Sequence, residues 1–166
     1  MKHIFYAVLL VFFIFVQIGF FSHLTFLKDL NLALCFLTIY FLQRKRLLLI
    51  YVILSGVLLD LYSIFPQGFY LVIFLLTFVF LNWLRPRFGD ISVLMNIVIA
   101  FLTLAFYQII FIILRFLLYY FGISQWSVIF DGSYFCHLGL FFALNILLIF
   151  LVNKLWAIPL KPKHLD

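Results

Sequence analysis

From Ser55 to Tyr70 the chain reads Ser-Gly-Val-Leu-Leu-Asp-Leu-Tyr-Ser-Ile-Phe-Pro-Gln-Gly-Phe-Tyr, and this stretch decides the fold. It closes an apolar run that begins at Leu47, and it places Asp60 close to the end of that run. A carboxylate inside an apolar helix is expensive, about 2.5–3.5 kcal/mol on membrane-insertion scales, so it marks a structural or functional contact. We therefore treat Asp60 as the first candidate site residue.

The neighbours of Asp60 indicate a tight helical hairpin. Gly56 lies one turn earlier on the same helix face, where the missing side chain permits close approach of a second helix. Pro66 and Gly68 then end the helix and turn the chain, because proline lacks a donor and glycine tolerates positive φ. The candidate contact residues of this stretch are Gly56, Asp60, Ser63, Pro66 and Gly68.

Composition places the chain in a bilayer. Of its 166 residues, 69% are hydrophobic and only 10% are charged, whereas soluble domains are about half apolar and a quarter charged. The length allows one polytopic domain over residues 1–166 and no separate aqueous domain. The net charge of +6 does not indicate nucleic-acid binding, because the basic residues fall between apolar segments.

Hydropathy predicts an all-α integral membrane protein with six spans. The expected ranges are 4–21, 26–42, 47–65, 69–84, 93–121 and 133–152. The apolar core of the second span, Leu30 to Leu42, has 13 residues and would measure only about 20 Å as a helix. It must extend back towards Leu24, thin the bilayer, or shelter behind its neighbours.

The basic residues predict that both termini lie in the cytoplasm. With six spans, one outer segment holds Lys28, and the inner segments hold nine basic residues: Lys2, Arg44, Lys45, Arg46, Arg85, Arg87, Lys154, Lys161 and Lys163. Nine against one satisfies the positive-inside rule. Arg115, near the outer end of the fifth span, either pairs with Asp60 or extends to the outer headgroups.

No set of residues predicts catalysis. The chain has no Glu, no glycine-rich phosphate loop and no hydrolase or metalloprotease signature. Cys35 and Cys136 lie in separate apolar segments without a metal-binding spacing. We expect no enzyme activity, no cofactor and no metal, and we expect Gln17 to face another helix.

The opening stretch resembles the rod shape-determining protein MreD family. The shared pattern is Gly-x-x-x-Asp-x-x-Ser-x-x-Pro-x-Gly, and Asp29-Leu30-Asn31 before a short second span is similar in style. Phe65-Pro66-Gln67 departs from the family, in which small or aliphatic residues are more common around the turn.

The resemblance implies a non-enzymatic scaffold subunit of the bacterial cell-wall elongation complex (the elongasome), which supports peptidoglycan synthesis and rod cell shape. It implies a multi-pass protein of the inner membrane that contacts MreC, and through it MreB, RodA and a penicillin-binding transpeptidase. Its fold would be similar to that of the substrate-binding subunits of vitamin transporters. No small-molecule ligand is expected for a scaffold.

A substrate-binding subunit of a vitamin-type transporter is the alternative function. It would need a polar pocket that opens outward, for which the candidates are Asp60, Ser63, Gln67, Gln108 and Arg115. The first span argues against this alternative, because Ala7 stands alone among bulky residues and offers no small-x-x-x-small face for docking.

Overall fold

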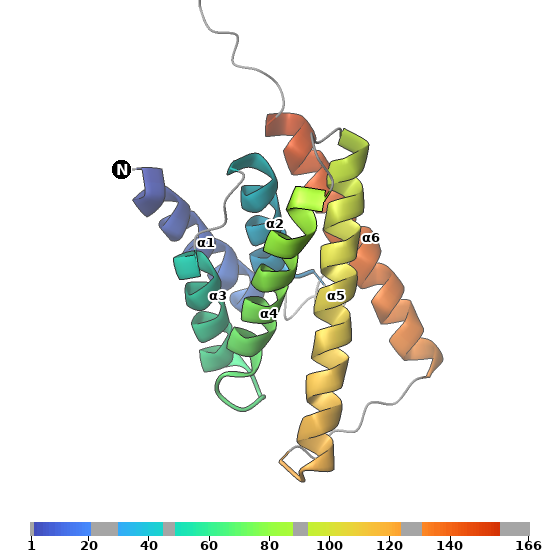
Figure 1. The fold of residues 1–166 in the computed structure, drawn as a ribbon. Coiled ribbons are helices and arrows are strands. Elements are labelled where there is room, and N and C mark those ends of the chain that lie inside the picture. The colour runs from blue at the N-terminus through green and yellow to red at the C-terminus, as the bar shows by residue number, and fades with distance from the viewer. Residues whose placement is uncertain (1, 21–29, 45–48, 88–92, 124–130, 157–166) are drawn as a thin grey trace, which may run out of the picture.

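The computed structural model describes residues 2–20, 30–44, 49–87, 93–123 and 131–156. Within these ranges the chain is helical and has no strand (Figure 1). It forms six α-helices and one short 3-10 helix: α1 Lys2–Gly19, α2 Leu32–Arg44, α3 Leu49–Tyr62, α4 Phe69–Leu84, η2 Arg85–Arg87, α5 Val93–Tyr120 and α6 Gly132–Trp156. The predicted all-α fold class is confirmed.

The helices lie at the six predicted apolar segments, although several bounds differ; α6, for example, continues to Trp156 rather than ending at 152. The second helix does not extend to residue 26 within the described chain, because Leu30 and Asn31 are not helical and α2 begins at Leu32. The third helix ends at Tyr62 rather than 65, because the Ser63 N–H already bonds the Asp60 carbonyl in a tighter turn. Several residues used for the topology lie outside the described ranges: Lys28, Asp29, Lys45, Arg46, Lys161 and Lys163.

The short helix α2 lies at the centre of the bundle. Every residue from Leu30 to Leu42 is buried, and α2 packs against α1, α3, α5 and α6. Neighbouring helices therefore cover α2, which is one of the three ways in which we expected so short an apolar segment to be accommodated. Buried hydroxyls bond within their own helices, as when Thr38 donates to the Leu34 carbonyl at 2.8 Å.

The remaining helices surround α2 in alternating directions (Figure 1). α3 packs on α4, α4 on α5 and α5 on α6, while α1 packs on α2 and α3. The ends of α2, α4 and α6 and the start of α5 therefore lie together at the top of Figure 1. Arg44, η2 and Lys154 are at these ends. Most basic residues of the described ranges therefore gather at one end of the bundle, apart from Lys2 at the start of α1 and Arg115 near the end of α5.

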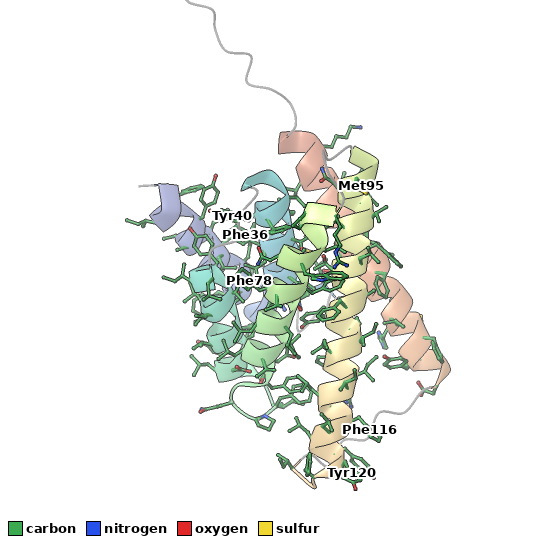
Figure 2. All side chains as sticks on the ribbon, viewed as in Figure 1. Phe36, Tyr40, Phe78, Met95, Phe116 and Tyr120 are labelled. Carbon is green, nitrogen blue, oxygen red and sulfur yellow. The ribbon has the colours of Figure 1, made fainter. Side chains whose placement is uncertain are left out.

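Two helices are long and apolar enough to cross a membrane. They cover Met95–Tyr120 in α5 and Gly132–Val152 in α6, and the other four are shorter apolar helices. Large apolar side chains remain exposed on the bundle, among them Phe5 and Phe12 on α1 and Phe116 on α5. Figure 2 shows Phe116 and Tyr120 at the lower end of α5, which projects beyond the α3–α4 turn.

Candidate functional site

The carboxylate of Asp60 caps the first turn of α4. Its Oδ2 atom accepts hydrogen bonds from the backbone N–H groups of Gly68 and Leu71, both at 3.1 Å. Its Oδ1 atom accepts one from the Tyr70 N–H at 2.7 Å. Both oxygens are therefore used, and the donors are groups that a helix start otherwise leaves without partners.

This arrangement explains why a charged side chain is stable in an apolar bundle. Asp60 is 7% exposed, and an unpaired buried carboxylate would be strongly destabilising. Three backbone donors and the positive end of the α4 dipole compensate the negative charge. The carboxylate joins the end of α3 to the start of α4, which is a structural contact, one of the two kinds that the sequence left open.

Gly56 brings the backbones of α3 and α4 into direct contact. A Cβ atom at this position would lie 2.5 Å from Cα of Leu71 and 3.0 Å from its nitrogen. No real side chain tolerates such a distance to backbone, so only glycine fits here. The predicted close helix approach at Gly56 is confirmed, and its partner is the first turn of α4.

Ser63, Pro66 and Gly68 form the turn between the two helices. The Ser63 hydroxyl lies within bonding distance of the carbonyl oxygens of Asp60 and Phe65, at 3.4 and 3.3 Å, and accepts from the Phe65 N–H at 3.2 Å. Gly68 has φ of 93°, a conformation that favours glycine. The Phe65 ring, at the position that departs from the resembled family, stacks on Phe69 with centroids 4.4 Å apart.

Arg115 is not a partner of the Asp60 carboxylate, whose bonds all go to the start of α4. The predicted alternative of an Asp60–Arg115 pair is therefore wrong. Arg115 instead lies near Tyr134, close enough for its charge to act on the phenol. The Nε atom of Arg115 is buried, and the extension of this side chain towards the headgroups stays a prediction.

A second polar cluster surrounds the start of α2. Asn31 caps the helix, since its Oδ1 accepts from the Leu34 N–H at 3.0 Å. Gln17 of α1 accepts from the Ala33 N–H at 3.2 Å, which confirms that Gln17 faces another helix. The first N–H groups of α2, a helix that begins inside an apolar bundle, are thus satisfied by the side chains of Asn31 and Gln17.

Asn145 of α6 and Tyr107 of α5 complete this cluster. The Asn145 Oδ1 atom accepts from the Asn31 N–H at 3.0 Å and from the Cys35 thiol at 2.9 Å. The Tyr107 hydroxyl accepts from Asn31 Nδ2 at 3.0 Å. Sequence analysis missed Asn145 and Tyr107, although a fully buried Asn in an apolar helix carries the same signal as Asp60.

A cavity of about 390 Å³ lies beside the start of α2. Its lining includes Tyr62, Ser63 and Tyr70, so it lies at the end of the bundle that holds the α3–α4 turn, opposite the gathered basic residues. Ser63 and Gln108 are among its lining residues, as expected for the alternative function. The other three candidates for a polar pocket, Asp60, Gln67 and Arg115, are not among its described lining residues.

Within the described chain, no three His, Cys, Asp or Glu side chains come together in a metal-binding group. Both cysteines are free, Cys35 buried and Cys136 exposed. Comparison with known proteins finds no matching family model, and neither a curated protein nor a solved structure is significantly similar to the chain.

Proposed function

We propose that the chain is an MreD-like scaffold of the bacterial inner membrane, which spans it six times with both termini inside. It binds MreC, and through MreC it positions MreB, RodA and a penicillin-binding transpeptidase for cell-wall elongation. The six-span topology has support in the apolar composition of all six helices, in the exposed apolar side chains of the five helices around α2, and in the basic residues gathered at one end of the bundle.

The proposal rests on one observation, the structural role that each residue of the Gly56–Gly68 pattern has in the α3–α4 hairpin. Gly56 admits the α4 backbone, the Asp60 carboxylate is saturated by three N–H groups, and Gly68 supplies the positive φ of the turn. A carboxylate held in this way has a geometric task. Such a task suits a protein that acts by presenting rigid helix faces to neighbouring helices.

Complementation tests the proposal. The gene is expressed in a rod-shaped bacterium depleted of its own MreD, cell width is scored, and membrane levels are checked by blot. Rods at normal protein level, together with an MreC that co-purifies in mild detergent, are the expected result. Round cells and no MreC in the eluate at that same protein level would refute the scaffold role.

The alternative, a substrate-binding subunit of a transporter, has one specific observation in its favour, the 390 Å³ cavity. The exposed face of α1 weighs against it, since that face presents bulky Phe5, Val8 and Phe12 rather than the small residues that dock closely packed helices. Purification separates the two functions, because a transporter subunit would bring down a transport module with an ATPase.

A further inference from the structure

The cavity beside the start of α2 is lined by both polar groups and aromatic rings, a combination that suits an uncharged ring. Gln17, Tyr70, Tyr107 and Gln108 contribute polar groups, and the rings of Phe111 and Phe141 contribute flat apolar surface. A volume of about 390 Å³ lies within the range of small-molecule sites. The space is large enough for one small ring and too small for a protein segment.

Several of these polar groups have donors that the described protein does not use. Tyr107 is 3% exposed, and its hydroxyl accepts from Asn31, so its own proton remains to be donated. The Gln17 oxygen accepts from Ala33, which leaves the amide nitrogen for another partner. Gln108 makes no hydrogen bond with another described residue. Tyr107 is buried, whereas Gln17 and Gln108 are half-buried and face the cavity wall, so all three can bond a molecule that enters the cavity.

The charges around the cavity restrict the ligand further. No Asp, Glu, Lys or Arg is among the described residues that line it; the lining does include His137, and Tyr134, near which Arg115 lies. The nearby Asp60 carboxylate is saturated by α4. The backbone donors at the α2 start are bonded to Asn31, Gln17 and Asn145. A cation would therefore lose its hydration without gaining an opposite charge, which is strongly unfavourable. An anion would meet no Lys or Arg among the described lining residues, so an uncharged ligand suits the wall best.

We propose that the cavity binds an uncharged sugar ring, either free or as the headgroup of a lipid. The C–H faces of such a ring pack on aromatic side chains, and its hydroxyls accept from Gln17 and Tyr107 and bond the amide of Gln108. This inference does not depend on the scaffold role, since a scaffold can carry a bound headgroup.

The test uses the full chain in a zwitterionic detergent that carries no sugar. Methyl glycosides of glucose, galactose and mannose are titrated while thermal unfolding is recorded, and at least one should raise the midpoint saturably. Octyl β-D-glucoside below its micellar concentration is the lipid-like probe. Binding of a methyl glycoside indicates a free sugar, and binding of the octyl glucoside alone indicates a headgroup.

Three variants place the binding in the cavity. Gln108→Leu and Tyr70→Phe should weaken it about five-fold or more, since each loses a hydrogen-bonding group. Gln67→Leu is the matched control, because Gln67 is exposed in the α3–α4 turn, and it should bind as the parent protein does.

No saturable shift with any probe, or shifts that persist unchanged in both cavity variants, would overturn the proposal. Native mass spectrometry of protein taken from membranes adds a third refuting outcome, a charged ligand in the cavity.

Discussion

Gly56 of α3 and Leu71 of α4 approach so closely that a Cβ atom on Gly56 would lie 2.5 Å from the Leu71 Cα. The atom it would meet belongs to a helix backbone that Asp60 holds in place through the Leu71 N–H. The hairpin therefore cannot open at this point without losing a bond to the carboxylate.

Gly56→Ala should accordingly destabilise the protein by about 1–3 kcal/mol, the usual cost of overpacking a tight contact. The measurement is the thermal unfolding midpoint in detergent. Gly139→Ala is the matched control, because it lies in α6 with nothing within 4 Å of an added Cβ. There the helix gains about 0.5–1 kcal/mol from the loss of glycine. Equal midpoints for the two variants would contradict the close contact.

Asn145→Leu should destabilise the start of α2. The change removes the acceptor of the Asn31 N–H and the Cys35 thiol, and an unsatisfied buried donor costs about 1–3 kcal/mol. Asn82→Leu is the control, since Asn82 is exposed and bonds only the Phe78 carbonyl of its own helix among its described contacts. Thiol labelling of Cys35 during thermal unfolding, in a Cys136→Ser background because Cys136 is exposed, reports the opening, which should come earlier in Asn145→Leu. Unchanged labelling would exclude a stabilising role for Asn145.

The two polar centres of the molecule differ in how far the sequence predicts them. Asp60 and Gly56 are identifiable because a carboxylate and a small residue on one helix face require a close partner. The partner itself is not identifiable, because a carboxylate can cap a helix, pair with Arg115 or hold a ligand. The three-dimensional structure distinguishes these alternatives, and it shows that Asp60 caps the start of α4.

The start of α2 is harder to predict for a physical reason. Hydropathy extends the second segment back to residue 26, but the helix begins at Leu32 because Asn31 caps it. The groups that stabilise this buried start lie 76 and 114 positions away, in Tyr107 and Asn145. A single sequence has no periodicity that links such distant residues. The polar cluster at the start of α2 and the cavity beside it could therefore not be predicted.

Cysteine accessibility tests the orientation of the bundle. Gln67 and Lys154 are both exposed and lie at opposite ends. We expect a membrane-impermeant maleimide to label Gln67→Cys on intact spheroplasts, and Lys154→Cys only after permeabilisation. Both variants carry Cys136→Ser, because Cys136 is exposed. Labelling in the reverse order would place both termini outside.

Asp60→Asn tests whether the carboxylate acts through geometry or through its charge. Both oxygens accept hydrogen bonds, so an amide nitrogen at either place faces an N–H donor and loses at least one bond, at about 1–3 kcal/mol. Asp60→Leu loses all three. The unfolding midpoint should therefore fall from the parent protein to Asn to Leu.

A geometric role predicts that function follows this order of stability. Rod shape in the complementation assay should then return for Asp60→Asn when growth at lower temperature restores its membrane level. The control is Asp131→Asn, at the exposed start of α6, where Oδ1 accepts from the Tyr134 N–H at 2.8 Å. Asparagine caps such a helix as well as aspartate does, so this variant should match the parent protein. If Asp60→Asn is as stable as the parent and still gives round cells, the charge itself is required, and the geometric role is wrong.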